Sequence, residues 1–388
     1  MADINIEAAE PLYDIEIEAW QPLRLILDQI GPFRQGPETF NFRGPDENGD
    51  PKPANIYMLL AKNGRGKTTA LEAIYGLFGL MADPPTGRFA TPRATGERAQ
   101  IDIRVGWRDR GGKKSCVLSI WTGSREPLEA WSDEEVIAAG NAQSWERLVV
   151  SAVTGEAQPI EPTSDFGLEL FRAIRAQRRI DPSQLYGASQ TMPTVLYFTA
   201  DRRIVAPLDE RAVMKPAGWG YQPAQIFASD GPEWAQSIDN LLVWLEWVGD
   251  DRVDDLINFL NQQLFVDTPG KVLRRPRRQD LASYISTRTG EHSLLGLSHG
   301  ERSLLQLYAR TLCHMTASTI LLIDEVENHL HPRWAQRLYS SLKDLFAQAP
   351  GLMTIFTTHS MALMETYKDD VAEPGIVRGG FLIEEDMN

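Results

Sequence analysis

Hydrophobic and polar positions follow different patterns in the two halves of this chain. Short, continuously apolar runs predict buried strands at 23–27, 56–60 and 194–198. Alternating positions on both sides of the turn at 110–113 predict a β-hairpin over 99–121, and helical segments are expected between that hairpin and the strand at 194. The first half is therefore expected to contain an antiparallel β subdomain.

The second half alternates between helical and strand periodicity. Proline residues mark a break, after which two helices are predicted near 232–247 and 251–264. A helix, a strand, a helix and a strand are then predicted in this order: 301–315, 319–323, 332–346 and 353–357. Strands that alternate with helices favour a parallel sheet with crossover helices, so the predicted fold class is α/β with an inserted helical lobe.

Composition limits the classes of protein that this chain can belong to. Hydrophobic residues make up 43% of its 388 residues and charged residues 24%, which is enough for a sizeable core. A net charge of −14 excludes a protein that coats nucleic acid non-specifically, so any such contact needs a confined basic patch. The two cysteines exclude a disulfide framework. An acidic first segment and the lack of an apolar stretch of about 18 residues predict a cytoplasmic protein.

The strongest local signal is the segment 61–68, which follows a buried strand and opens a helix. Gly64 and Gly66 allow the backbone to wrap a phosphate with its N–H groups. Lys67 can reach the β- and γ-phosphates, and Thr68 can ligate Mg²⁺ at the start of the helix. The usual first glycine of such a phosphate loop is Ala61 here.

Two carboxylates, Asp324 and Glu325, directly follow an apolar strand segment at 320–323. At the carboxyl end of a strand, Asp324 can hold Mg²⁺ through water and Glu325 can polarise an attacking water. An acidic strand end is common by itself, and the phosphate loop upstream is what favours this interpretation.

Two further segments complete an ordered series. Residues 297–301 place Ser298 and Gly300 at a helix start, where a hydroxyl and free N–H groups can meet an anion. His359 follows the next predicted strand and could contact a γ-phosphate. Each feature alone has an ordinary structural explanation, and only their order favours a common site.

Together these residues resemble the ABC-type ATPases, and within them the branch that includes the SMC, RecF and OLD-like proteins. Residues 61–68 resemble the Walker A motif, 297–301 the signature motif and 320–325 Walker B, with His359 in the place of the switch histidine. Residues 324–332 are close to a run found in OLD-like ATPases, many of which belong to bacterial anti-phage systems. The resemblance implies a P-loop NTPase fold of the ABC type. The N-terminal part of the ATPase head, with Walker A and an antiparallel β subdomain, is expected over 1–205, an inserted helical lobe with the basic segment over 206–296, and the C-terminal part of the head over 297–388.

The resemblance also implies the site residues. Nucleotide binding falls to Asn63, Gly64, Arg65, Gly66, Lys67, Thr68, Thr69, Ser298, Gly300 and Glu301, Mg²⁺ binding to Thr68 and Asp324, and catalysis to Glu325 and His359. The family's Q-loop glutamine has no clear counterpart, and Gln190 is a weak candidate.

The family mechanism implies pairs of subunits that share ATP between them. Each ATP would lie between one Walker A loop and the other subunit's Ser298 and Gly300, giving a homodimer or a higher even-numbered oligomer. Long coiled-coil arms are not predicted, and the 29 residues after His359 are too few for the nuclease domain of OLD proteins. An effector is therefore expected on a separate polypeptide, with a nuclease as one candidate.

A basic segment stands out on this acidic chain. Five bases fall within eight residues: Lys271, Arg274, Arg275, Arg277 and Arg278. A nucleic-acid contact, docking to an acidic partner and a solvated loop are equally open interpretations. Arg202 and Arg203 follow a strand end and are weak candidates for contact with nucleotide or nucleic acid.

Three functional hypotheses follow. The first is a Mg²⁺-dependent ATPase that regulates an effector in a bacterial anti-phage complex. The second is a RecF-like DNA-repair clamp that closes on duplex DNA with ATP. The third is a nucleotide-dependent scaffold with little turnover, against which Glu325 argues.

Overall fold

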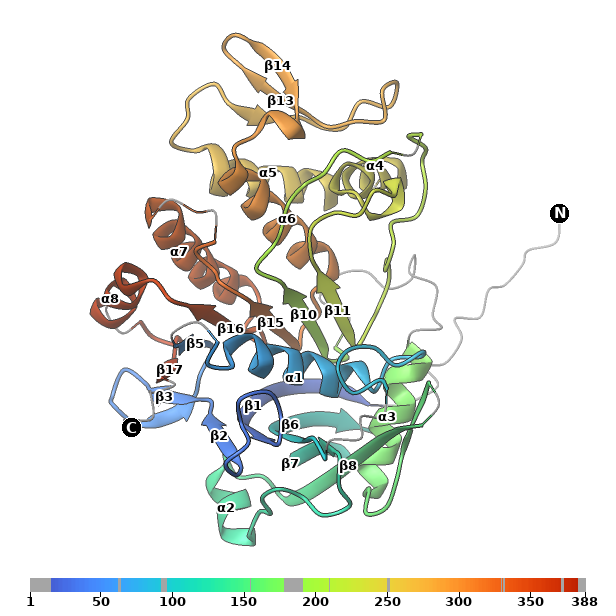
Figure 1. Ribbon diagram of the computed structural model, residues 1–388, viewed down its shortest axis with the longest axis vertical. Coiled ribbons are helices and arrows are strands. Elements are labelled where there is room, and N and C mark those ends of the chain that lie inside the picture. Colours follow the sequence, from blue (N-terminus) through green and yellow to red (C-terminus); the bar gives the residue numbers. More distant parts are fainter. Residues whose placement is uncertain are drawn as a thin grey trace, which may run out of the picture.

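The computed structural model describes residues 15–61, 64–91, 96–153, 155–177, 191–208, 210–249, 252–328, 330, 332–370 and 373–382. In Figure 1 these residues form layers along the longest axis of the molecule. An N-terminal sheet lies at one end, helix α1 (Lys67–Gly79) and a parallel sheet lie in the middle, and helices with a small sheet lie at the other end.

The central sheet is parallel throughout. Its strand order is β11-β10-β15-β16-β5-β17, and every neighbouring pair runs in the same direction. The strands are β5 (Ile56–Leu60), β10 (Thr194–Phe198), β11 (Ala224–Phe227), β15 (Thr319–Ile323), β16 (Met353–Thr358) and β17 (Arg378–Leu382). The α/β fold class with a parallel sheet is thus confirmed.

The N-terminal sheet has the order β2-β1-β6-β7-β8-β9. Its strands are β1 (Glu16–Asp28), β2 (Glu38–Asn41), β6 (Arg98–Asp109), β7 (Gly112–Thr122), β8 (Ser144–Val153) and β9 (Glu156–Pro159). All pairs are antiparallel except β7 with β8. The expectation of only helices between the hairpin and residue 194 is wrong, because β8 and β9 lie there beside α2 (Asp133–Ala138) and α3 (Asp165–Gln177).

Two hydrophobic cores lie on opposite faces of the parallel sheet. One packs α1 between the parallel sheet and the N-terminal sheet, with Leu71, Ile74 and Phe78 fully buried. The other packs five later helices against the opposite face of the parallel sheet. These helices are α4 (Ile238–Val248), α5 (Arg252–Phe265), α6 (His299–His314), α7 (Pro332–Gln348) and α8 (Met361–Asp369). Strands buried on both faces explain why they read as continuous apolar runs rather than alternating ones.

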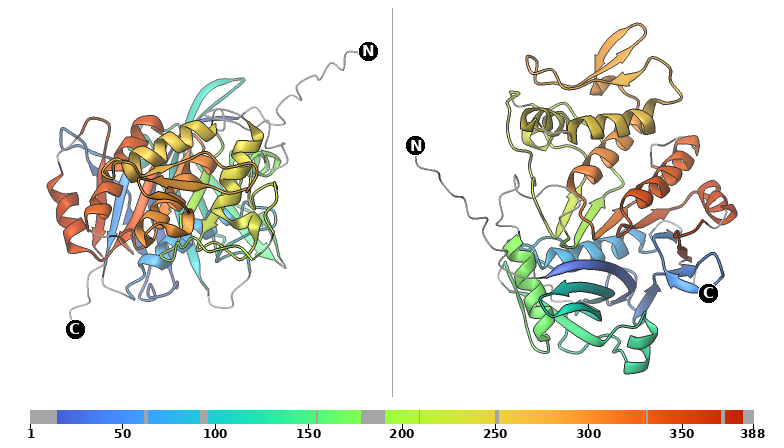
Figure 2. Two further views of the ribbon diagram at one scale, coloured as in Figure 1. Left: turned by 90° about the horizontal axis from the view of Figure 1, so that it is seen from above. Right: turned by 180° about the vertical axis from the view of Figure 1, so that it is seen from behind.

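The helical lobe carries a small sheet at its outer end, seen beyond α5 in Figure 1 and in the right view of Figure 2. This sheet has the order β12-β13-β14, with strands Val272–Leu273, Tyr284–Thr287 and Gly290–Ser293. The basic segment is therefore not a simple loop, because it includes β12. A short hairpin, β3 (Arg43–Pro45) with β4 (Pro51–Pro53), precedes β5.

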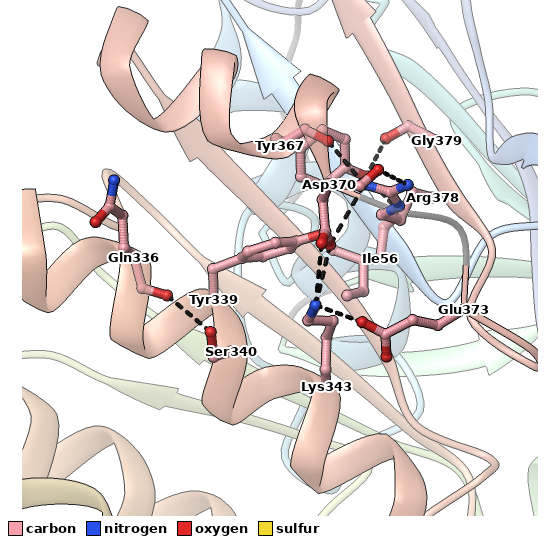
Figure 3. A network of polar contacts seen from close by, with 10 residues as sticks. All are labelled: Ile56, Gln336, Tyr339, Ser340, Lys343, Tyr367, Asp370, Glu373, Arg378 and Gly379. Carbon is pink, nitrogen blue, oxygen red and sulfur yellow. Dashed lines mark hydrogen bonds and ion pairs between the residues drawn. The ribbon is translucent and has the colours of Figure 1, made fainter.

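A polar network joins α7, α8 and β17 (Figure 3). Lys343 Nζ lies 3.0 Å from Asp370 Oδ2 and 2.7 Å from Glu373 Oε1. Tyr339 donates its hydroxyl proton to the same Asp370 carboxylate at 2.7 Å, and Arg378 donates to the Asp370 carbonyl oxygen at 2.7 Å. The network fixes the end of α8, which begins two residues after His359.

Among the described helices, none is both long enough and apolar enough to cross a bilayer.

His314, in the last turn of α6, is expected to make stability depend on pH. Burial, helped by nearby Arg310, lowers the pKa of this imidazole to about 3. In the unfolded chain the imidazole pKa is about 6.5. At pH values between about 3 and 6.5 the unfolded chain therefore binds a proton at His314 that the folded chain does not. The free energy of unfolding thus falls as the pH drops below about 6.5. Because part of the residue is exposed, we expect a loss of about 1 to 2 kcal/mol in the free energy of unfolding between pH 7 and pH 5.

Urea unfolding at the two pH values measures this loss. His314→Gln, which does not titrate, should show a correspondingly smaller difference between pH 7 and pH 5. An equal difference in the variant and the parent would assign the pH dependence to other groups.

Candidate functional site

Three neighbouring strands of the parallel sheet deliver the predicted site residues to one edge. β5, β16 and β15 lie side by side, with Leu60 paired to Thr358 and Phe356 paired to Ile323. The phosphate loop follows β5, Asp324 follows β15 and His359 follows β16. Since the carboxyl ends of parallel strands share an edge, the sequence motifs meet there as the ligand sites of open α/β sheets do.

The loop after β5 has the backbone geometry of an anion cradle. Gly66 caps α1 in the left-handed region, at φ 96°, and a Cβ there would lie 2.5 Å from the ring of Phe33. Lys67 is buried, and its Nζ donates to the Ala61 carbonyl oxygen at 2.5 Å. Ala61, in the place of the usual glycine, thus supplies only a main-chain oxygen here. The N–H groups at the start of α1 have no helical carbonyl partners, as anion binding at a helix N-terminus requires.

Asp324 joins the phosphate loop to the strand end. Thr68 Oγ1 donates to Asp324 Oδ2 at 2.8 Å, although 256 residues separate the two positions. Thr357 Oγ1 donates to Asp324 Oδ1 at 2.6 Å, so both carboxylate oxygens accept a hydrogen bond. The same Thr357 oxygen accepts the backbone N–H of Glu325 at 2.7 Å. Sequence reasoning did not assign Thr357 a role, and its place at the end of the neighbouring strand was the available signal.

Glu325 and His359 take their positions from main-chain contacts. Glu325 has φ 44°, in the left-handed region that non-glycine residues seldom adopt, and is partly exposed. His359 contacts Glu327 in two ways. Its Nδ1 lies 3.0 Å from Glu327 Oε1, and its backbone N–H donates to the same oxygen at 2.7 Å. Because Nδ1 faces the Glu327 carboxylate, Nε2 is the ring nitrogen left for other contacts. Glu327 was a further residue that the sequence reasoning missed.

Arg202 lies behind this site rather than on its surface. The expectation that Arg202 contacts nucleotide or nucleic acid is wrong, because the guanidinium is enclosed and bonded to main-chain oxygens of Thr199, Asp324 and Glu325. Burial lowers the pKa of Arg202 to about 10, which still leaves it protonated at neutral pH. Arg203 is exposed and pairs with Asp201.

The residues of the predicted signature motif lie away from the phosphate loop. Ser298 is exposed and caps α6, accepting the Glu301 N–H while the Glu301 carboxylate accepts the Ser298 N–H at 2.9 Å. Within the described part of the chain, no hydrogen bond joins Ser298 or Gly300 to Gly64–Thr69. Glu301 is tied instead to Lys271, at 2.6 Å. One chain therefore brings together the Walker residues and His359, but not Ser298, Gly300 and Glu301.

The other predicted residues are placed as follows. Arg65, beside Gly66, and Thr69, in the first turn of α1, are partly buried, whereas Asn63 and Gln190 lie outside the described residues. In the basic segment, four of the five bases form ion pairs with acidic residues of the same lobe: Lys271 with Glu301, Arg275 and Arg278 with Glu246, and Arg277 with Glu291. Arg274 is exposed, and no side-chain ion pair joins it to a described residue.

Part of the chain is similar to a known family of domains. Residues 245–365, which include 298–325 and His359, match the family described as "AAA domain, putative AbiEii toxin, Type IV TA system". The α/β fold and the geometry at the strand ends agree with nucleotide binding.

This chain is similar over part of its length to two curated relatives. It is 36% identical over 87 residues to "Retron Vc95 probable ATPase" of Vibrio cholerae serotype O1 biovar El Tor, covering 20% of this chain and 16% of that protein. It is 34% identical over 85 residues to "Retron Ec83 probable ATPase" of Escherichia coli, covering 19% of this chain and 15% of that protein. The matched segment thus spans about one sixth of each relative's length.

A distant likeness to a solved structure is also found. The structure is that of CbiO1 from Clostridium perfringens, which is described as part of the ABC transporter complex CbiONQ. The match covers 88% of this chain and 79% of the CbiO1 chain. The sequence identity is 10% and the TM-score is 0.32.

Proposed function

We propose that the chain hydrolyses ATP with Mg²⁺, and that ATP joins two copies of it. The observation that carries this proposal is the hydrogen bond between Thr68 and Asp324, which puts the hydroxyl of the phosphate loop against the strand-end carboxylate. A hydroxyl and a carboxylate oxygen are ligands that Mg²⁺ accepts together with nucleotide phosphates. The residues present therefore fit the ion.

Each side chain has a defined task in this proposal. Lys67 and the N–H groups at the start of α1 bind the phosphates, and Thr68 with Asp324 would hold Mg²⁺, which neutralises phosphate charge when bound. Glu325 orients the attacking water and accepts its proton. His359, held by Glu327, presents Nε2 to the γ-phosphate. Thr357 fixes both Asp324 and the main chain of Glu325.

The second half of the site is proposed to come from another copy. Ser298 is exposed at the N-terminus of a helix on the face of the parallel sheet opposite α1, so it can meet an anion bound by a second chain. Two such contacts form a symmetric homodimer, or the repeating unit of a larger even-numbered oligomer. This arrangement is that of the SMC, RecF and OLD-like branch.

We further propose that this ATP-dependent pairing regulates an effector on a separate polypeptide in bacterial antiviral defence. Partial relatedness to two retron "probable ATPase" proteins supports this role. The ion pairs of the basic segment give the alternative of a DNA-repair clamp less support, since most of its positive charge is neutralised within the lobe.

Mixing two inactive variants tests the shared site. Lys67→Ala removes the phosphate ligand and Ser298→Arg blocks the contact in trans, so each variant alone is expected to lose turnover. In a mixed dimer, one of the two sites combines the intact Lys67 of one chain with the intact Ser298 of the other. Random pairing should then restore turnover, up to about one quarter of the parent's ATPase rate per chain, because half the dimers are mixed and each has one working site.

The ATPase rate of the parent per chain should also rise with protein concentration. A mixture that stays inactive while the parent is active would contradict the shared site. A parent chain that binds ATP tightly but shows no turnover at any concentration would contradict the ATPase itself.

A further inference from the structure

Arg202 makes an unusual number of main-chain contacts at the strand ends. It is 2% exposed, and its Nη1 donates to the carbonyl oxygens of Thr199 and Asp324, each at 2.7 Å. Its Nη2 donates to the carbonyl oxygen of Glu325 at 3.3 Å. One planar guanidinium thus fixes the turn that follows β10 to the turn that follows β15.

These contacts converge on a residue in a constrained conformation. Glu325 has a positive φ, its N–H donates to Thr357, and its carbonyl oxygen accepts from Arg202 and, at 2.8 Å, from the backbone N–H of Asn328. A non-glycine residue persists in this region only when its surroundings impose it. The direction of the Glu325 side chain therefore depends on Arg202 on one side and on Thr357 on the other.

The fourth contact of Arg202 reaches a different element. Its Nε donates to Ser303 Oγ at 3.3 Å, and both side chains are buried. Ser303 belongs to α6, the same helix that Ser298 caps. One continuous helix thus connects the exposed Ser298 to the guanidinium that contacts Glu325.

We propose that Arg202 is a positioning residue that couples the two halves of the shared site within one chain. When Ser298 engages the nucleotide of a second copy, α6 sets Arg202 through Ser303, and Arg202 sets the main chain of Glu325 at the chain's own nucleotide. This inference rests on the proposed ATPase dimer, and it adds the route by which one site controls the other.

Substitutions at Arg202 separate positioning from binding. Arg202→Lys keeps the charge but cannot reach three carbonyl oxygens at once, and Arg202→Met removes the contacts altogether. We expect kcat to fall by about 10-fold for Arg202→Lys and by about 100-fold for Arg202→Met. The dissociation constant for a fluorescent ATP analogue should change by less than about 3-fold in both variants. Arg203→Ala, next in sequence but exposed, is the matched control and should leave both quantities unchanged.

Ser303→Ala tests the coupling itself and keeps the guanidinium and its carbonyl contacts. The variant should retain kcat within about 3-fold of the parent but lose the cooperative dependence of rate on ATP, with a Hill coefficient that falls toward 1. It also keeps the proposal testable if an Arg202 variant fails to fold, as thermal unfolding would reveal.

The possible failures are distinguishable. A parent chain without turnover would contradict the proposed function. An active parent whose folded Arg202→Met variant has normal kcat, or whose Ser303→Ala variant keeps the cooperativity, would overturn only the present inference. A fall in ATP affinity that matches the fall in kcat would also overturn it, since Arg202 would then support binding rather than position Glu325.

Discussion

Glu325→Gln is expected to lower kcat for ATP hydrolysis by about 100- to 1000-fold while leaving ATP affinity nearly unchanged. The substitution keeps the size of the side chain but removes its ability to accept the proton of the attacking water. The contacts that fix the main chain at this position come from Thr357 and Arg202 and do not involve the lost carboxylate. Single-turnover hydrolysis and binding of a fluorescent ATP analogue measure the two quantities separately.

The same variant should accumulate as an ATP-bound dimer, because closure precedes the step that it blocks. Size-exclusion chromatography with ATP and Mg²⁺ should therefore show a larger species for Glu325→Gln than for the parent. Asp344→Asn, an isosteric change at an exposed acid on α7, is a suitable control and should behave as the parent does. Retention of more than about a tenth of the parental kcat would assign the proton acceptor to another residue.

Asp230→Ala is expected to lower the free energy of unfolding by about 3 kcal/mol. Asp230 and Arg310 form a buried ion pair at 3.0 Å, and their side chains are 0% and 8% exposed. Burial raises the pKa of Asp230, whereas the Arg310 partner acts in the opposite direction. Removal of the carboxylate leaves the Arg310 charge enclosed and also removes a 2.9 Å acceptor from Gln306. Urea unfolding measures the loss.

An exposed pair provides the matched comparison. Asp201 and Arg203 lie 2.8 Å apart with side chains 51% and 57% exposed, so Asp201→Ala should cost less than about 1 kcal/mol. The double variant Asp230→Leu with Arg310→Met should be more stable than Asp230→Ala, because no unpaired charge remains buried. If Asp230→Ala proves no more costly than Asp201→Ala, the ion pair does not hold α6 against the end of β11.

The strands predicted at 56–60, 194–198 and 319–323 agree with β5, β10 and β15 at both ends. Each of them is covered on both faces, so its apolar run is continuous and has clear limits. β17 was missed because its sequence is Arg-Gly-Gly-Phe-Leu, and glycine weakens any strand signal. The glycines are required by close packing: a Cβ on Gly379 would lie 2.5 Å from the Arg43 carbonyl oxygen and 2.8 Å from the Tyr57 ring.

β8 was missed for a different reason. Its apolar residues form a short run at 148–150, and a run of that length does not distinguish a strand from a buried helical turn. Pairing with β7, which runs parallel to it, decides the outcome. The deciding contacts lie in another part of the chain, where no local pattern records them.

The sequence by itself determined the phosphate loop, the carboxylate pair at 324–325 and the order of the motifs, because glycine spacing and a polar end to an apolar strand are local properties. Tertiary structure alone decided what surrounds them. Thr357, Glu327 and Arg202 acquire their roles from partners 33, 32 and 122 residues away, at Asp324, His359 and again Asp324. Most of the bases at 271–278 likewise form ion pairs with acidic residues that only folding brings near. A hydrogen bond or ion pair depends on distance in space, and that distance is set by the packing of the sheet and helices rather than by neighbours in the chain.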